Sequence, residues 1–331
     1  MRLISHINND PKGDSCIMRR APFFQELKMK KILSFVIILA IFASCGDSVE
    51  ERKRLSRAER ARLAKEDSLA LKVGVLPTLD CLPLYVARQA NLFEKFGADV
   101  RLKPFNSQID CDAALVKGSI EGCVTDVVRA ERMKRQGRAL RYATATNAYW
   151  QLISNRKARV REIRQLEDKM MAMTRFSATD LLGDLAVDSV KMRSENVFRV
   201  QINDPNVRLQ MLLNNEMDAM LLTEPQATTA RLLKNPVLMD SKQRDIRLGA
   251  VVFRENDLKD QHRSKQYQVF LKAYNSACDS INKYGVLHYS ELVKKFTKAD
   301  DRTLKALPKM HFQHASSPRQ KDIDRAVKWL K

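Results

Sequence analysis

The sequence lacks the short patterns that mark many catalytic and metal-binding sites. None of its six cysteines forms a C-x-x-C pair, which argues against structural zinc and thioredoxin-like chemistry. It has no G-x-S-x-G elbow, no H-E-x-x-H helix and no G-x-x-x-x-G-K-S/T phosphate loop. His311 and His314 have no further metal ligands near them in the sequence, so we expect no metal site and no cofactor. A dispersed enzyme site is the alternative to a binding function.

The sequence also lacks an apolar run long enough for a membrane-spanning helix, which needs about 20 residues. The largely apolar residues 32–42 follow a short basic segment and end at Ala43 and Ser44, directly before Cys45. Such an arrangement is typical of an export signal, and the small residues before the cysteine resemble the lipobox of bacterial lipoproteins. We predict a signal peptide over residues 29–44 and a lipid on Cys45; an uncleaved anchor or an ordinary secretory signal is the alternative.

The net charge of +20 raises the question of nucleic-acid binding. Much of the basic excess lies directly after Cys45, and the chain shows no aromatic platform of the kind that single-strand binders use. We therefore expect no nucleic-acid partner. Residues 45–70 are interpreted as a charged tether, either a short helix or a disordered stretch, close to anionic headgroups. Residues 1–28 are interpreted as a mis-assigned start or a disordered leader.

From residue 71 onward, short apolar runs alternate with helical patterns, which indicates βαβ units and a parallel sheet. Ser177 and Asp204, the latter followed by a proline, are predicted helix N-caps. The predicted strands cover residues 71–76, 100–105, 122–126, 169–173, 198–202, 219–222 and 248–253. The predicted helices include residues 82–95, 110–117, 204–214, 264–283, 287–296 and 318–330.

Four segments carry a resemblance to a known family. LKVGVLPTLDCLPLYVARQANLFEKFG at 71–97 resembles the opening of periplasmic binding proteins of the nitrate, taurine, aliphatic-sulfonate and thiamine-pyrimidine-precursor group. DAALVKGSIEGCVTD at 112–126, LEDKMMAMTRFSATDLL at 166–182 and NDPNVRLQMLLNNEMDAMLLTEP at 203–225 are similar to its later segments. The similarity covers roughly residues 70–330. The cysteine-rich motif of the thiamine-precursor branch is missing, which argues against that ligand.

The resemblance implies an α/β, two-lobed periplasmic-binding-protein-like fold of type II, with a mostly parallel sheet flanked by helices in each lobe. Lobe 1 would comprise residues 71–145 and 247–331, and lobe 2 residues 146–246. The implied function is delivery of a small molecule to an ABC permease and its ATPase by a monomer anchored in the cell envelope at the periplasmic face. A pyrimidine-biosynthesis-like enzyme and a ligand sensor without transport are the competing functions.

The candidate ligand-binding residues follow predicted strands, because ligands of open α/β sheets lie beyond the carboxyl ends of the strands. They are Thr78, Asp80, Asn106, Gln108, Thr125, Asp126, Arg175, Ser177, Thr223 and Glu224. Tyr149 and Trp150 could stack on a flat ligand near the crossing between the lobes.

Each candidate also has an ordinary structural role as its alternative. Asp80 and Asp126 could cap helices, and Arg175 could pair with a surface acid. Glu224 could hold a hydrogen bond between the lobes, and Trp150 could belong to the core. Acidic candidates favour a cationic ligand and Arg175 favours an anion, so the sequence leaves the ligand charge open.

Cys81 and Cys111 follow the first two predicted strands, which are neighbours in the sheet of the binding proteins that the chain resembles. Parallel neighbours lie about 4.8 Å apart, and a disulfide needs Cα atoms about 4.4–6.8 Å apart. An exported chain also meets oxidising conditions. The sequence therefore permits a bridge between Cys81 and Cys111; two buried thiols are the alternative, and Cys123 is a rival partner.

The lipobox predicts how the chain is anchored. The Cys45→Ser substitution removes the thiol that would carry the lipid, so it should release the protein from membranes or block its processing. Membrane fractionation with intact-mass measurement checks this. Unchanged membrane association and mass in the variant would contradict lipidation at Cys45.

Overall fold

The computed structural model describes residues 57–331. The predicted leader, the signal peptide and Cys45 lie outside this range, so the structure does not test them. Residues up to 67 and residues 68–331 form two separate units, and each is considered by itself. Among residues 57–331, no helix has the length and apolarity that a bilayer crossing requires.

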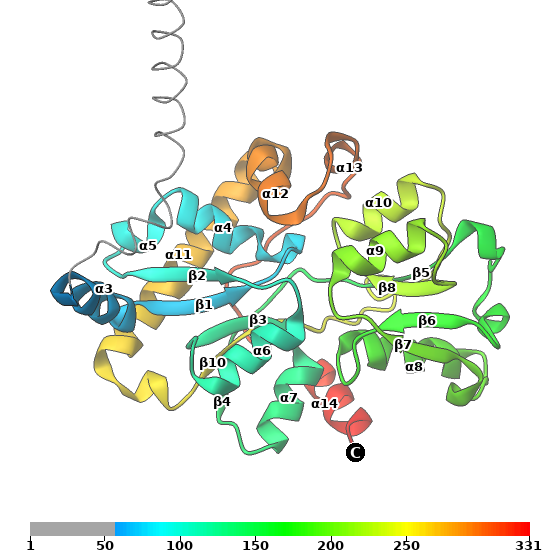
Figure 1. Cartoon of the computed structure of the whole chain (residues 1–331), viewed down its shortest axis with the longest axis horizontal. Helices are drawn as coiled ribbons and strands as arrows, with labels where there is room; N and C mark the ends of the chain where they lie inside the picture. Colours follow the sequence, from blue (N-terminus) through cyan, green and yellow to red (C-terminus); the bar gives the residue numbers. More distant parts are fainter. Residues whose placement is uncertain (1–56) are drawn as a thin grey trace, which may run out of the picture. The chain divides into compact units, whose positions relative to one another are not determined.

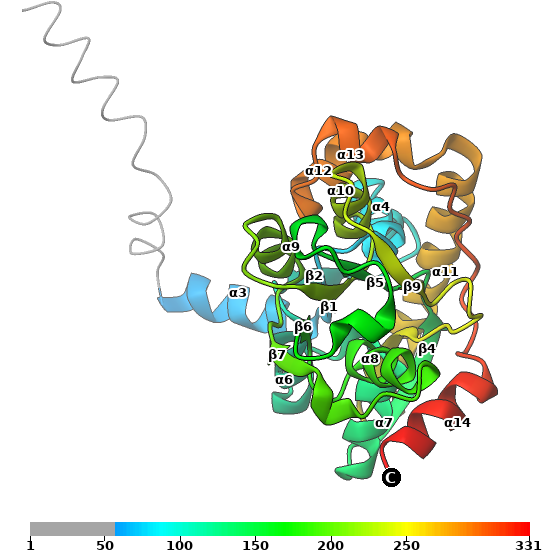
Figure 2. The same ribbon diagram turned by 90° about the vertical axis from the view of Figure 1, so that its right-hand side faces the viewer.

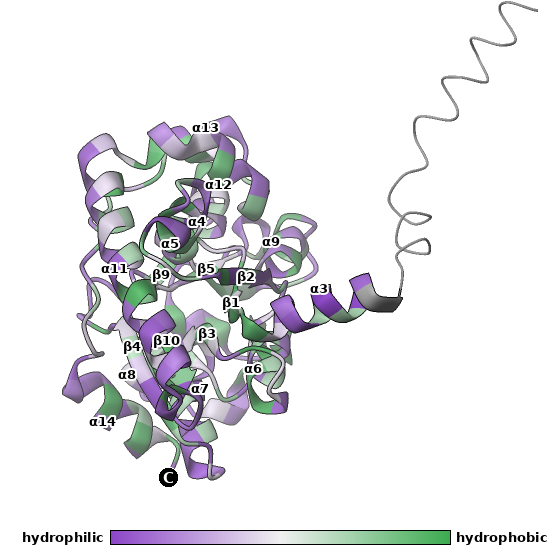
Figure 3. Ribbon diagram, turned by 90° about the vertical axis from the view of Figure 1, so that its left-hand side faces the viewer, coloured by the Kyte–Doolittle hydropathy of each residue, from purple (hydrophilic) through white to green (hydrophobic). Residues whose placement is uncertain are grey.

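The described part of the predicted tether is helical. Helix α3 (Arg57–Leu69) is mostly hydrophilic (Figure 3) and is rich in alanine, arginine, lysine and leucine, which favour helix formation. Arg62 and Glu66, one turn apart, form an ion pair at 3.7 Å.

The first sheet lies in lobe 1 (Figure 1). In spatial order its strands are β2 (Val100–Pro104), β1 (Leu71–Val75), β3 (Gly122–Asp126), β10 (Gly249–Arg254) and β4 (Leu140–Ala145). β1 pairs in parallel with β2 and β3, and β10 pairs antiparallel with β3 and β4. Four of the five strands therefore run in one direction. β3 is buried along its whole length, as expected for a strand with helices on both faces.

Helices cover both faces of this sheet. One face packs against η1 (Leu79–Cys81), α4 (Leu82–Gln89), α5 (Leu92–Lys95), α11 (Gln261–Tyr284) and α12 (Ser290–Thr297). The other face packs against α6 (Gln108–Lys117) and α7 (Val127–Arg135). Gly74 allows the close approach of α6, because a Cβ atom there would lie 2.4 Å from the Cys111 sulfur.

The second sheet lies in lobe 2 and repeats the arrangement. Its strands, in spatial order, are β7 (Phe198–Gln201), β6 (Met170–Met173), β8 (Ala219–Leu222), β5 (Gln151–Ser154) and β9 (Val237–Asp240). Only β5 runs against the others. Helix α8 (Ala178–Ser189) covers one face, and α9 (Pro205–Leu213) and α10 (Gln226–Leu232) cover the other. Ser177 caps α8 and Asp204 caps α9, as predicted.

Two stretches cross between the lobes, and a third contacts both of them. Residues 146–150, the first crossing, join β4 to β5, and residues 241–248, the second crossing, join β9 to β10. The third, the C-terminal segment of residues 306–319, runs from α13 (Asp301–Lys305) to α14 (Gln320–Trp329). Helix α14 lies beside α7 and α8 (Figure 2).

Two hydrogen bonds fix α14 to both lobes. The indole of Trp329 donates to Asp184 on α8 at 2.6 Å, and Arg135 on α7 donates to the carbonyl of Leu330 at 2.5 Å. The end of the chain is thus part of the contact between the lobes.

The structure corrects several predicted elements. The predicted helix over residues 82–95 is two helices, because Asn91 takes a left-handed φ of 52° between them. The predicted helix over 287–296 begins as a 3-10 turn, η6 (Val286–Tyr289). The prediction omitted α7, β4, β5, β9, α10 and α13.

Cys81 and Cys111 are not bridged, because they lie on opposite faces of the first sheet. Cys81 packs with α4 and α11, whereas Cys111 on α6 packs with Cys123 on β3. All four cysteines in the described range are buried free thiols. Burial raises the pKa of Cys81, and the contact with Cys111 together with burial raises the pKa of Cys123.

Folding alone should protect these thiols from alkylation. In native protein, Cys81, Cys111, Cys123 and Cys278 should resist alkylation, because burial limits access and disfavours the thiolate. In denaturant without reductant, all four should react. Peptide mass spectrometry reads both states. Recovery of a Cys81–Cys111 disulfide peptide under denaturing conditions would contradict this arrangement.

Candidate functional site

A small cavity lies between the two lobes, at the carboxyl ends of their strands. Its volume is about 40 Å³, which is room for a few water molecules or a small ion. Six of the predicted residues line this cleft cavity: Thr78, Asp80, Gln108, Thr125, Trp150 and, from lobe 2, Thr223. Lobe 2 also contributes Asn203, Pro205 and Arg208. The search for polar residues at the carboxyl ends of predicted strands thus identified residues that are far apart in the sequence and line one cavity.

Asp80 provides a buried carboxyl group on the lobe 1 side. It is 6% exposed and accepts a hydrogen bond from the hydroxyl of Thr146 at 2.8 Å. Burial raises the pKa of Asp80, and hydrogen bonds from Thr78 and Thr146 oppose this shift. The carboxyl group is therefore held in place by the first crossing.

Arg208 provides a buried cation on the lobe 2 side. It is 6% exposed, and one guanidinium nitrogen donates to the carbonyl of Leu221 at 2.7 Å. Its Nε atom has no hydrogen-bond partner among residues 57–331, and no carboxylate in that range lies within ion-pair distance of it. Burial lowers the pKa of Arg208 to about 10, so the group is still charged near neutral pH.

Arg208 was missed at the sequence level, although a signal was present. It occupies the buried face of α9 together with Pro205, Leu209 and Leu212. A charged residue at a core position of a helix is costly unless it has a partner. An arginine on an apolar stripe would therefore have marked this position.

Asp126 connects the lobes directly without lining the cavity. Its carboxylate accepts hydrogen bonds from the backbone N–H of Arg129 at 2.9 Å and from Gln108 at 2.8 Å. It also accepts one from the backbone N–H of Ala178, at the start of α8 in lobe 2. Burial, which outweighs these donors, raises the pKa of Asp126 to about 6.

Other contacts also close the lobes on each other. The N–H of Leu79 donates to the carbonyl of Glu224 at 2.8 Å, and Gln226 donates to the carbonyl of Pro77 at 2.9 Å. Arg129 donates to the carbonyl of Arg175 at 3.3 Å. The structure therefore represents a closed arrangement.

The remaining predicted residues lie elsewhere. Asn106 and Arg175 are exposed and do not line the cleft cavity. Ser177 is buried and accepts a hydrogen bond from the N–H of Thr179 as the cap of α8. The side chain of Glu224 points into a second cavity and pairs with Arg231 at 2.8 Å.

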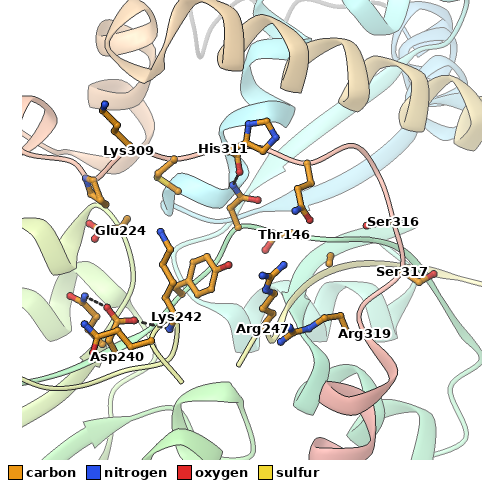
Figure 4. A pocket seen from close by; sticks show the side chains of 18 of the residues that line it. Thr146, Glu224, Asp240, Lys242, Arg247, Lys309, His311, Ser316, Ser317 and Arg319 are labelled. Carbon is orange, nitrogen blue, oxygen red and sulfur yellow. Dashed lines mark hydrogen bonds between the residues drawn. The ribbon is translucent and has the colours of Figure 1, made fainter. Parts of the chain in front are cut away.

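This second cavity, the crossing pocket, has a volume of about 590 Å³ (Figure 4). Its wall comes from both crossings, from Glu224 and Arg231 in lobe 2, and from the C-terminal segment. Side chains alternate along the extended first crossing. From residue 147 onward, Asn147, Tyr149 and Gln151 line the crossing pocket, and Ala148 and Trp150 line the cleft cavity; Ala145 and Thr146 before them both line the crossing pocket. Tyr149 and Trp150 therefore serve different cavities.

His311 and His314 do not form a metal site with other residues. His314 contacts Asp279 at 2.7 Å, and His311 lines the crossing pocket. Within residues 57–331, no group of three potential metal-ligating side chains comes together.

The fold is similar to that of solved bacterial binding proteins. The ligand-binding component of an ABC-type import system from Staphylococcus aureus, solved with zinc bound, is 18% identical. That likeness covers 79% of this chain and 91% of the other, with a TM-score of 0.66. The alkanesulfonate-binding protein SsuA from Xanthomonas axonopodis pv. citri, bound to MOPS, is 15% identical, with coverage of 79% and 91% and a TM-score of 0.65.

The nitrate-binding protein NrtA from Synechocystis PCC 6803 is also 15% identical, with coverage of 71% and 68% and a TM-score of 0.62. No protein-family model and no curated protein sequence matches the chain. At these identities the likeness concerns the fold. The predicted α/β fold of two lobes, with mostly parallel sheets flanked by helices, is therefore confirmed.

Asp126 should make stability depend on pH. Its pKa rises from 3.8 to about 6 on folding, so the folded chain favours the neutral carboxyl group. The protonated Asp126 carboxyl group therefore stabilises the fold fully below pH 3.8, and this stabilisation is lost as the pH rises through about 6. The free energy of unfolding should fall by about 3 kcal/mol over that range. The side chain in Asp126→Asn does not titrate, so this loss of stability should disappear. Between about pH 4 and 7 the free energy of unfolding of the variant should therefore rise by about 3 kcal/mol relative to that of the wild type.

Denaturant unfolding at a series of pH values measures the difference. Asp188→Asn, at an exposed position on the same α8 that Asp126 contacts, is the matched control. Parallel stability curves for the wild type and Asp126→Asn across this range would show that the Asp126 carboxyl group does not titrate there.

Proposed function

We propose that the protein is a solute-binding protein that captures a small polar molecule between its lobes for an ABC importer. In this proposal Cys45 carries a lipid that holds a monomer at the periplasmic face of the cell envelope. The permease and ATPase of the importer are its protein partners. The names of the structural neighbours, two of which bind sulfonate or nitrate, support this function through the shared fold.

The buried charge of Arg208, which makes no ion pair among residues 57–331 and feels the carboxylate of Asp204 only at longer range, is the observation that carries the proposal. A buried cation without a carboxylate is strongly unfavourable, and bound anions are a common solution. Arg208 faces a cavity that also exposes Asp80, Gln108 and Thr125. The arrangement favours a solute with an anionic group for Arg208 and a hydrogen-bond donor for Asp80.

The closed lobes explain how such a solute would be held. The cavity measures about 40 Å³ and hydrogen bonds hold the lobes together near it, so a solute of greater size requires the lobes to separate further. A ligand that contacts both lobes shifts the population between the open and closed forms. Small-angle scattering of the free and loaded protein would follow that shift.

Two competing functions use the same cavity differently. An enzyme would require a nucleophile or a general base beside the solute; among the lining groups Asp80 is the candidate base, whereas Thr78, Thr125 and Gln108 are ordinary hydrogen-bonding groups. Turnover of the bound molecule would support the enzyme over the receptor. A sensor would bind the same solute without stimulating the ATPase of the importer.

Arg208→Gln tests the proposed site. The glutamine keeps a donor near Leu221 but removes the charge, so the anionic group of the solute loses a charge-assisted hydrogen bond of about 1.5–3 kcal/mol. The affinity should fall about 10- to 100-fold. Mass spectrometry of small molecules released from natively purified protein identifies the solute, and calorimetry then measures the affinity.

Arg138→Gln, at an exposed position in lobe 1, is the matched control and should bind as the wild type does. Thermal unfolding of the ligand-free Arg208→Gln variant separates binding from structure. Because the substitution removes a buried unpaired charge, the ligand-free variant should unfold at a temperature close to that of the wild type. Full occupancy by the same solute in Arg208→Gln would contradict the proposed site.

A further inference from the structure

The crossing pocket has no role in the function proposed above, yet it has the size of a ligand site. Its volume of about 590 Å³ falls within the range of about 300–1,000 Å³ typical of small-molecule sites. Its lining is separate from that of the cleft cavity, since no residue lines both. Three stretches of chain that are distant in sequence meet around it.

The lining of the crossing pocket has an excess of positive charge. Its basic side chains are Arg231, Lys242, Arg247, Lys309 and Arg319, and its acidic side chains are Glu224 and Asp240. Both acids already have partners within the protein. Glu224 accepts from Arg231 at 2.8 Å, and Asp240 accepts from Gln151 at 2.6 Å. Glu224 is thus paired with a cation, whereas Asp240 keeps its negative charge, because the Gln151 amide and the backbone N–H of Lys242 that donate to it are neutral. The lining still has five basic side chains against two acidic ones.

Of the two cations that the second crossing contributes to the pocket, Lys242 has no ion pair within the described residues and Arg247 has only a long one. The ammonium group of Lys242 makes no ion pair with any of residues 57–331, and its recorded contact is the ring of Tyr149 at 5.6 Å. Arg247 lies 3.6 Å from Asp245, and its buried Nε has no hydrogen-bond partner within the described range. Asp245 is itself shared with Arg319 at 2.6 Å and Lys321 at 2.5 Å.

The geometry directs both cations into the same space. Lys242 and Arg247 extend from the second crossing toward the C-terminal segment that carries His311 and Ser316 (Figure 4). Tyr149 and Met310 add apolar surface to the wall. A guanidinium and an ammonium group facing one cavity suit a carboxylate or phosphate group, and the apolar wall suits an organic body.

We propose that the crossing pocket is a second binding site, which takes a small organic anion through Lys242 and Arg247. The anionic group lies between the two cations, and the remainder of the molecule packs against Tyr149 and Met310. This site is independent of the solute in the cleft cavity.

Calorimetric titration of the full-length protein with citrate and, separately, with AMP tests the site and distinguishes a carboxylate from a phosphate ligand. At least one of these probes should bind with a dissociation constant of about 0.1–1 mM at low salt. Its affinity should weaken as the ionic strength rises, since the attraction is between charges. The Lys242→Gln, Arg247→Gln double variant should weaken binding at least tenfold. Arg244→Gln changes an exposed cation of the same crossing outside the pocket and should bind as the wild type does.

A second measurement on the unmodified protein avoids any folding defect of the variants. The bound probe should slow acylation of Lys242 by an amine reagent, read by mass spectrometry, and should leave the exposed Lys265 unchanged. If neither probe binds at about 10 mM, ten times the weakest expected dissociation constant, the proposal is overturned. Binding that persists in the double variant but disappears in Arg208→Gln would also overturn it, because the probe would then occupy the cleft cavity.

Discussion

The carboxyl group of Asp126 accepts hydrogen bonds from the start of a helix in each lobe, and the closed arrangement buries it where the lobes meet. The first amides of a helix have no partners within the helix. Asp126 ends β3, caps α7 in its own lobe and reaches the N–H of Ala178 at the start of α8 in the other lobe. The second contact exists only while the lobes meet. Separation of the lobes therefore exposes an amide and a buried carboxylate to water together.

The two ionisable groups of the cleft cavity link closure of the lobes to binding of the proposed solute. Asp80 belongs to lobe 1 and Arg208 to lobe 2, and each is 6% exposed in the closed form. Closure without a solute removes both groups from water without giving Arg208 an anionic partner, which is unfavourable. A solute that neutralises Arg208 removes that penalty. Closure of the lobes and binding of the solute in the cleft cavity would thus favour each other, as a receptor that delivers a bound solute requires.

The sequence predicted features that depend on local rules and missed those that depend on tertiary placement. The caps Ser177 and Asp204 followed from local side-chain chemistry. Asn91 broke a predicted helix because apolar spacing alone does not reveal a left-handed residue. The search of strand ends located Asp80 and Thr125, but it specifies a loop rather than the direction of each side chain, so Asn106 is exposed.

The absence of the possible Cys81–Cys111 bridge and the omission of Arg208 have related physical causes. Adjacent strands place two loops at one edge of a sheet, but the helices that follow can cover opposite faces. Right-handed connections to either side of β1 place α4 and α6 on opposite faces, which separates Cys81 from Cys111. Arg208 lies in the first turns of α9 rather than directly after a strand, so a search of strand ends passes over it.

The side chains of residues 147–151 in and after the first crossing face two cavities in turn, which restricts insertions and deletions at this point. Side chains at 147, 149 and 151 face the crossing pocket, and those at 148 and 150 face the cleft cavity. An extended strand that loses or gains one residue turns every following side chain to its other face. A single-residue insertion or deletion here would therefore exchange the linings of two cavities at once. Substitutions can alter either cavity separately, whereas changes of length at this point would alter both.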